Sequence, residues 1–389
     1  MAKVGKHDIG CILIAFLLIL FMMPYWVWGV NVLFFRIPFL LLSYMYVGLK
    51  SVKQKQLLAG FIVLISSIQI MKGNNIFGLI DGLCIAFIMF LQTDSLSKTY
   101  LYFTRLLSIL LAGSLIVLLL VTLGLPISSR ILPPLNELKS GYYISFPLLL
   151  VYVEKGDSLL RFCAMFDEPG VVGTICSIIL FIEGFNLKKF SNVVFFISGI
   201  LTFSLFFYLG ILVFLIVRVF IRKNIKTTLY TMLGIVVFFF VISSVAILRD
   251  SIGVRIQYDS TTHEIRGDNR ASEELVHYID VTRGSSHYFF GYPQKDVVYY
   301  SGSAGYRNAI LTYGVVFLAF YFLFMHTYIK TYSKSNKVHY FYCISILILV
   351  LYQRPGILAP EYLFLFACLF RICAINFNGY SYEKNKSNI

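Results

Sequence analysis

The chain has 389 residues, of which 58% are hydrophobic and only 13% are charged, and its formal net charge is +14. An average soluble domain is about a quarter charged, so this composition excludes an ordinary soluble enzyme and favours a membrane protein. Repeated apolar runs of about 17 or more residues predict membrane helices, because barrel strands would alternate between polar and apolar residues. The positive charge does not indicate nucleic-acid binding, since most lysines lie at the ends of apolar runs, as orientation signals do.

In chain order, the apolar runs predict an all-α polytopic membrane protein with about 12 transmembrane helices. The expected spans are residues 9–29, 31–49, 57–71, 76–93, 103–124, 169–185, 190–205, 206–222, 228–248, 309–329, 339–353 and 358–376. The run 190–222 is too long for one ordinary helix, so we expect a tight hairpin near Ser204. No small-residue cleavage site precedes Pro24, and we expect the first helix to be retained.

These spans divide the chain into three parts. Residues 1–248 are expected to hold nine helices with an outer loop at 125–168, residues 249–308 to form one large outer loop, and residues 309–389 to hold three helices and a cytoplasmic tail. With the N-terminus in the cytoplasm, most lysines then fall on the inner side, as the positive-inside bias requires.

Arginine follows the opposite trend. Arginines expected on the outer side are Arg130, Arg161, Arg249, Arg255, Arg266, Arg270, Arg283, Arg307 and Arg354. A guanidinium group is planar, permanently charged and able to bind phosphate bidentately, so this distribution favours an anionic ligand at the outer face. The alternative interpretation is that long translocated loops ignore charge and that these arginines are ordinary solvated residues.

The outer loop 125–168 holds two features of interest. Its segment from Tyr142 to Val153 is apolar but too short to cross a membrane, so we expect a re-entrant or interfacial segment. Further along, Phe166-Asp167-Glu168-Pro169-Gly170 opens the next span, and proline is favourable in the first turn of a helix. Glu168 is therefore expected at the outer mouth of this helix, either as a cap for the helix dipole or as a carboxylate placed to accept a proton.

The large outer loop carries the other candidate groups. Its stretch from Glu273 to Val281 predicts one short amphipathic helix. His287 lies nearest to the return into the membrane, and it is expected to be a base, a partner of a sugar hydroxyl or an ordinary surface histidine. His287, His263 and His277 lack the close spacing of metal ligands, and the chain has no P-loop, so we expect no metal and no other cofactor.

Two charged residues, Arg36 and Asp81, fall within predicted spans. Both lie in the outer third of their spans, so they could pair, either as a structural ion pair or as functional intramembrane charges. The seven cysteines sit mostly in apolar runs, and we interpret them as small core residues, not as a disulfide framework.

Several features of the layout occur together: many spans, Arg161 followed by the Glu168-Pro169 motif at the opening of a mid-chain span, and one large outer loop late in the chain. Within this loop, Arg255 is followed by Asp268-Asn269-Arg270 and then by Phe290-Gly291-Tyr292. This arrangement resembles the bacterial O-antigen and capsular polysaccharide repeat-unit polymerases of the O-antigen polymerase/ligase superfamily. Tyr292-Pro293 replaces the second glycine of the family's Phe-Gly-x-Gly motif.

The resemblance implies a lipid-dependent glycosyltransferase of GT-C-like architecture in the bacterial inner membrane, with its active site facing the periplasm. Such a polymerase transfers a growing glycan from undecaprenyl diphosphate to the next lipid-linked repeat unit. The implied partners are the undecaprenyl-diphosphate-linked oligosaccharide, the lipid bilayer, a chain-length regulator and a flippase, with no nucleic acid.

The implied chemistry assigns roles to particular residues. The departing diphosphate needs cationic stabilisation, which arginines supply without a metal. The expected diphosphate ligands are Arg161, Arg255, Arg270 and Arg307. Glu168 is the first choice and His287 the second choice of base for the acceptor hydroxyl, and Tyr288 and Tyr292 are expected to stack on sugars.

Other functions stay open at this point. The related O-antigen ligases, which transfer polymer to lipid A-core, share the architecture. A transporter of lipid-linked glycans would show paired broken spans in two related halves, and we find no such symmetry in the sequence. A binding or assembly protein without catalysis would tolerate the loss of Glu168 and of the loop arginines.

Overall fold

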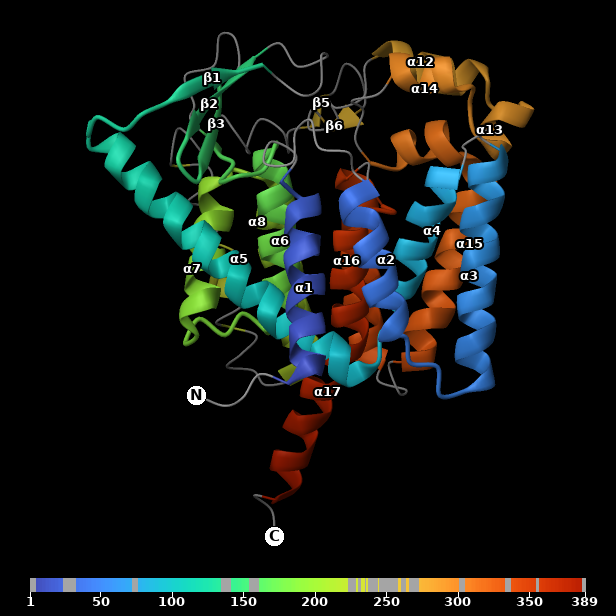
Figure 1. The fold of residues 1–389 in the computed structure, drawn as a ribbon, viewed down its shortest axis with the longest axis horizontal. Helices are drawn as coiled ribbons and strands as arrows, with labels where there is room; N and C mark the ends of the chain where they lie inside the picture. The colour runs from blue at the N-terminus through green and yellow to red at the C-terminus, as the bar shows by residue number, and fades with distance from the viewer. Residues whose placement is uncertain are drawn as a thin grey trace. The chain divides into compact units, whose positions relative to one another are not determined.

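A computed structural model shows that the part of the chain it describes is mostly helical (Figure 1). It describes residues 5–23, 33–71, 76–133, 141–153, 161–222, 258–259, 264–265, 273–300, 305–332, 337–354 and 357–386, together with isolated positions between 229 and 244. The chain folds into two compact units. Unit 1 comprises Met1–Leu18, Gly29–Phe103 and Arg270–Ile389, and unit 2 comprises Ile19–Trp28 and Thr104–Asn269.

Unit 1 is a bundle of apolar helices with three short helices at one end. Its helices are α2 (Leu33–Met45), α3 (Val52–Met71), α4 (Ile76–Met89), α12 (Glu273–Val281), α13 (Ser286–Phe290), α14 (Gln294–Tyr299), α15 (Tyr306–Tyr332), α16 (Lys337–Gln353) and α17 (Pro360–Lys386). It also holds the first parts of α1 (Lys6–Phe21) and α5 (Thr93–Thr122). Within this unit, the beginning of α1 and the end of α17 lie at one end, and α12, α13 and α14 lie at the other (Figure 1).

The core of unit 1 joins segments that are far apart in the sequence. Phe61 of α3 stacks on Phe324 of α15, with 4.1 Å between the ring centroids. The buried Arg371 of α17 donates from Nη1 to the Leu91 carbonyl (2.7 Å) and from Nη2 to Thr93 Oγ1 (2.8 Å). A buried charge needs such partners, so these bonds fix α17 against the start of α5.

Two local expectations about unit 1 are confirmed. Arg36 of α2 and Asp81 of α4 form an ion pair, with 2.7 Å between Nε and Oδ1. The predicted amphipathic helix coincides with α12, whose buried Leu275 and Ile279 pack against the start of α15. In both units the cysteines are buried and free.

Unit 2 corrects the expectation of an all-α fold. Its segment 130–162 forms a four-stranded antiparallel sheet in the order β1 (Arg130–Leu132), β2 (Tyr142–Phe146), β3 (Leu149–Val153) and β4 (Arg161–Phe162). A second, two-stranded ladder joins β5 (Tyr258–Asp259) to β6 (Glu264–Ile265).

The predicted re-entrant or interfacial segment is therefore a β-hairpin. Pro147 divides the apolar stretch into two five-residue runs that are rich in β-branched and aromatic residues, which favour strands. Tyr142 pairs with Val153 and Phe146 with Leu149 across the turn. Tyr143 is buried in this hairpin, whereas Tyr142 is exposed.

The helices of unit 2 confirm the expected hairpin near Ser204. They are α6 (Pro169–Ile182), α7 (Phe190–Leu201), α8 (Leu205–Arg222) and the later part of α5. The chain reverses between α7 and α8, where Phe203 has a φ of 49° and the Thr202 hydroxyl accepts from the Ser204 N–H at 3.2 Å. The tight turn explains how an apolar run too long for one helix is accommodated.

Among the described residues, two helices, Thr93–Thr122 and Tyr306–Tyr332, are long and apolar enough to cross a membrane. Shorter apolar helices are His7–Phe21, Phe34–Met45, Leu79–Met89, Pro169–Ile182, Phe190–Leu201, Leu205–Val217 and His339–Tyr352. The expected span 228–248 lies almost entirely outside the described residues. The number of 12 spans and the GT-C-like architecture stay predictions.

Candidate functional site

The membrane-span candidate α15 is broken near its start. Gly314 has φ 79° and ψ 166°, a conformation outside the helical region. A Cβ at Gly314 would lie 2.3 Å from the Phe289 carbonyl oxygen and 2.6 Å from the Gly291 nitrogen. The Tyr292 N–H donates to the Leu311 carbonyl at 2.9 Å. The end of α13 is thus joined backbone to backbone with the break in α15.

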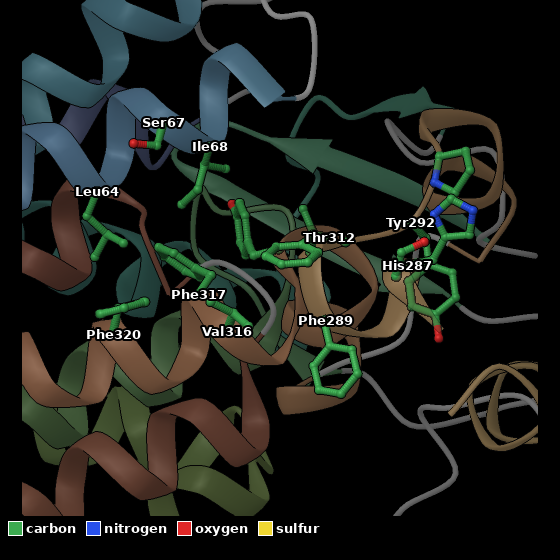
Figure 2. Close-up of a pocket in the computed structure, with 15 residues that line it drawn as sticks. Leu64, Ser67, Ile68, His287, Phe289, Tyr292, Thr312, Val316, Phe317 and Phe320 are labelled. Carbon is green, nitrogen blue, oxygen red and sulfur yellow. The ribbon is translucent and has the colours of Figure 1, made fainter. Parts of the chain in front are cut away.

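A cavity of about 520 Å³ lies beside this junction (Figure 2). It is lined by Leu64, Ser67 and Ile68 of α3, by Ser286, His287 and Phe289–Pro293, and by Thr312, Tyr313, Val316, Phe317 and Phe320 of α15. Figure 2 shows Leu64 and Ile68 facing Phe317 and Phe320, while His287 and Tyr292 lie toward the other end. One end of the cavity is therefore lined mostly by apolar side chains, with the Ser67 hydroxyl among them, and His287 and Tyr292 lie at the other.

His287, the second-choice base, is exposed on α13 and lines the cavity. α13 begins after Ser285, whose side chain accepts from the Tyr288 N–H at 3.3 Å. This cap fixes the first turn of the helix and hence the place of His287. An exposed imidazole at the wall of a cavity can accept a proton from a bound hydroxyl.

The two predicted sugar-binding tyrosines have different surroundings. Tyr292 lines the cavity but is only 5% exposed. Its hydroxyl bonds to Thr282 Oγ1 at 2.6 Å, and its ring lies 5.3 Å from that of Tyr278. Tyr288 packs against the hydrophobic cluster of Leu275, Ile279, Tyr292 and Leu311, and it does not line the cavity. Of the two rings, the structure brings only Tyr292 to the cavity wall.

A hydrogen bond between α12 and α14 lies next to Tyr292. Tyr278 of α12 donates to Asp296 Oδ2 of α14 at 2.8 Å. Burial, together with this hydrogen bond to a carboxylate, raises the pKa of Tyr278 to about 12. The bond joins α12 to α14 and fixes the Tyr278 ring that packs against Tyr292.

The predicted diphosphate ligands are distributed over both units. Arg307 lies in the first turn of α15, with its guanidinium carbon 5.6 Å from the centroid of the Tyr306 ring. Arg161 lies on β4 of unit 2, opposite Tyr152 of β3. Arg255 and Arg270 lie outside the described residues. Of the four arginines, Arg307 is thus described in unit 1 and Arg161 in unit 2.

Glu168, the first-choice base, occupies the position expected from the sequence. It is the N-cap residue of α6, with φ −142° and ψ 137°, and Pro169 is the first helical residue. The Glu168 side chain makes no capping hydrogen bond, and its place at the helix N-terminus suits both a carboxylate that interacts with the helix dipole and one that accepts a proton. The Tyr143 hydroxyl donates to the neighbouring Asp167 carbonyl and fixes the chain at the entrance to α6.

Sequence reasoning missed most of the cavity. Leu64, Ile68 and Phe317 are ordinary apolar residues of predicted spans, and nothing in their local sequence marks them as a binding wall. Gly314 offered the one usable signal, a glycine within an apolar span, which favours a break or a close backbone approach. Among the described residues, no group of three His, Cys, Asp or Glu side chains is arranged to hold a metal ion.

Comparison with family models, with curated proteins and with solved structures finds no match to this chain.

Proposed function

We propose that the protein is a membrane glycosyltransferase that polymerises lipid-linked glycan repeat units. In this proposal it crosses the bacterial inner membrane about 12 times, has a GT-C-like architecture and works at the periplasmic face. The observation that carries the proposal is the cavity beside the break in α15, because one end is lined mostly by apolar side chains and His287 and Tyr292 lie at the other. A lipid-linked glycan has the same division between an isoprenoid chain and a sugar head.

The position of the break supports this assignment. Irregular backbone within a membrane helix is tolerated where it lines a cavity or is buried in protein. Gly314 lies in a stretch without Asp, Glu, Lys or Arg between Arg307 and Lys330. The cavity at this depth could take the start of the isoprenoid chain between Phe317 and Leu64, with the head group toward His287.

The chain supplies the groups that the transfer needs. His287 or Glu168 accepts the proton of the acceptor hydroxyl as it attacks the anomeric carbon of the growing glycan. Arginines stabilise the departing diphosphate, with Arg161, Arg255, Arg270 and Arg307 as the candidates. The hydroxyl of Thr312 at the cavity is a further partner for the head group.

The test is the polysaccharide ladder of the host after deletion of the gene. Complementation uses the wild type and the variants Glu168→Gln, His287→Gln and Arg270→Ala. His277→Gln is the matched control, because His277 is exposed on α12 and does not line the cavity. We expect deletion to leave a single repeat unit, the site variants to restore the ladder poorly, and His277→Gln to restore it fully.

Other ladder patterns would indicate a different function or different site residues. Long polymer stranded on undecaprenyl diphosphate would identify a ligase. An unchanged ladder would contradict both transferase functions and favour a transporter or an assembly protein. Full complementation by every site variant would leave the class of function intact and show that the assigned residues are wrong.

A further inference from the structure

The short helix α13 lies beside an uncharged part of α15. The two residues that follow it are in backbone contact with α15: the Tyr292 N–H donates to the Leu311 carbonyl at 2.9 Å, and a Cβ on Gly291 would lie 2.9 Å from the Thr312 carbonyl oxygen. Gly314 lies in the stretch of α15 between Arg307 and Lys330, which holds no Asp, Glu, Lys or Arg. α13 therefore lies against a part of α15 without charged side chains.

The composition of α13 suits an apolar environment. No Asp, Glu, Lys or Arg lies between Arg283 and Lys295. Phe289 is 41% and Phe290 is 55% exposed, although both are large apolar side chains. In water, this exposure would cost the free energy of hydrating two adjacent aromatic rings. Phe320 of α15, which is 54% exposed, is another exposed ring that lines the same cavity.

The backbone N–H groups at the end of α13 and just after it have acceptors within the protein. The Tyr288 N–H donates to Ser285 Oγ and the Phe289 N–H to the Ser285 carbonyl, both at 3.3 Å. The Gly291 N–H donates to His287 O at 2.8 Å, the Tyr292 N–H is bonded to α15, and Pro293 has no N–H. A segment in hydrocarbon must satisfy its donors internally, and this one does so at these positions.

We propose that α13 lies within the outer leaflet and that Phe289 and Phe290 contact lipid acyl chains. This inference rests on the membrane placement of α15 in the proposed function. Its consequence is that Phe289, Phe290 and Phe320 border the cavity on the side of the lipid. A lipid-linked substrate can then enter the cavity from the leaflet without carrying its isoprenoid chain through water.

The test places one tryptophan at a time in a Trp26→Phe, Trp28→Phe background, because the chain has two native tryptophans. The protein is reconstituted in vesicles of ordinary or brominated phosphatidylcholine, in which bromine on the acyl chains quenches nearby tryptophan. The probes are Phe290→Trp on α13, Leu323→Trp on α15 (58% exposed) and Val281→Trp on α12 (69% exposed). We expect severalfold stronger quenching of Phe290→Trp and Leu323→Trp than of Val281→Trp.

The other quenching patterns would contradict either the placement of α13 in the lipid or the placement of α15 in the membrane. Quenching of Leu323→Trp without quenching of Phe290→Trp would place α13 outside the lipid and contradict this inference while α15 remains in the membrane. Equal quenching at all three positions would also contradict it, because α13 would then have no special depth relative to α12. Absence of quenching at both Leu323→Trp and Phe290→Trp would contradict the membrane placement of α15 and with it the proposed function.

Discussion

Residues 130–170 of unit 2 and residues 273–314 of unit 1 both connect apolar helices, but their backbones differ. In the first segment, Leu148 and Ala164 have positive φ angles of 62° and 49°. In the second, Gly291 has φ 98° with ψ 154°, and Gly314 has φ 79° with ψ 166°. The left-handed region of Leu148 and Ala164 costs an L-residue about 1–2 kcal/mol, whereas the region of Gly291 and Gly314 is nearly restricted to glycine.

The difference reflects how each segment is held in place. The first segment is anchored by a sheet ladder and by the bond from the Tyr143 hydroxyl to the Asp167 carbonyl. This segment also has one close backbone approach, because a Cβ on Gly141 would lie 2.3 Å from the Val153 carbonyl oxygen, but Gly141 has no positive φ. The second segment is anchored by direct approach of two backbones at Gly314. At Gly314 the close approach is combined with φ 79° and ψ 166°, so we expect Gly314 to be more sensitive than Gly141 to the addition of a methyl group.

Gly314→Ala is the substitution with the largest expected effect. The added Cβ would meet the Phe289 carbonyl oxygen at 2.3 Å, which is backbone and cannot turn away, and the φ of 79° is unfavourable for alanine. We expect a loss of about 3 kcal/mol or more in the free energy of unfolding. All seven cysteines are buried and free, so reaction with a thiol-specific dye during heating in detergent reports unfolding.

Gly60→Ala is the matched control for Gly314→Ala. Gly60 lies within α3, and a Cβ there would meet nothing within 4 Å. Alanine is favoured over glycine inside a helix by about 0.5–1 kcal/mol, so this variant should be as stable as the wild type or slightly more stable. Equal stability of Gly314→Ala and Gly60→Ala would show that α13 is not held at the break.

Tyr143→Phe tests the anchor of the first segment. The Tyr143 hydroxyl is buried against the Asp167 carbonyl, and its removal leaves that carbonyl without this donor. We expect a loss of about 1–2 kcal/mol in the free energy of unfolding, clearly less than for Gly314→Ala. Dye reaction measures the loss, and Tyr142→Phe on the exposed neighbour is the control. A loss larger than that of Gly314→Ala would reverse the comparison between the two segments.

The two segments also differ in what the sequence could predict. The helix at 273–281 and the turn near Ser204 depend on local composition, and both were predictable. Glu168 could be placed at the start of α6 because Pro169 determines where the helix begins. The sheet was missed because its strands are short and its pairs, such as Ile131 with Ile144, depend on contacts across a loop.

The cavity could not be predicted from the sequence for a different reason. Its walls come from α3, α13 and α15, and α3 is separated from the other two by more than half of the chain. His287 was a candidate because of its chemistry and its closeness to a span, not because of a known neighbour. Gly314 is one of 27 glycines, and only the structure shows that the Phe289 carbonyl lies against it.

Tyr278→Phe tests the polar support of the second segment. It removes the bond to Asp296 Oδ2, and because Tyr278 is partly exposed we expect a loss of about 1 kcal/mol at neutral pH. The pKa of Tyr278 is raised to about 12 in the folded protein, above about 10 for an unfolded tyrosine. The stabilisation is therefore complete below pH about 10 and is lost as the pH rises toward 12.

The measurement for Tyr278→Phe is thermal unfolding between pH 8 and pH 12, values chosen from the raised pKa of about 12. The wild type should lose stability more steeply than the variant above pH about 10. Tyr299→Phe, at an exposed tyrosine of α14, should leave both the neutral stability and the alkaline slope unchanged. Parallel slopes for the wild type and Tyr278→Phe would contradict the contribution of this phenol.

Ala164→Gly has the smallest expected effect and the opposite sign. Ala164 has a φ of 49° in the first segment, so glycine relieves the cost of a left-handed alanine, about 1–2 kcal/mol. The gain is offset by the greater freedom of glycine in the unfolded chain and by the loss of a buried methyl group. We expect a net gain between about 0 and 1 kcal/mol in the dye-reaction assay. A loss of more than about 1 kcal/mol would mean that the methyl group of Ala164 is itself part of the anchor, and that the sheet segment is packed as tightly as the junction at Gly314.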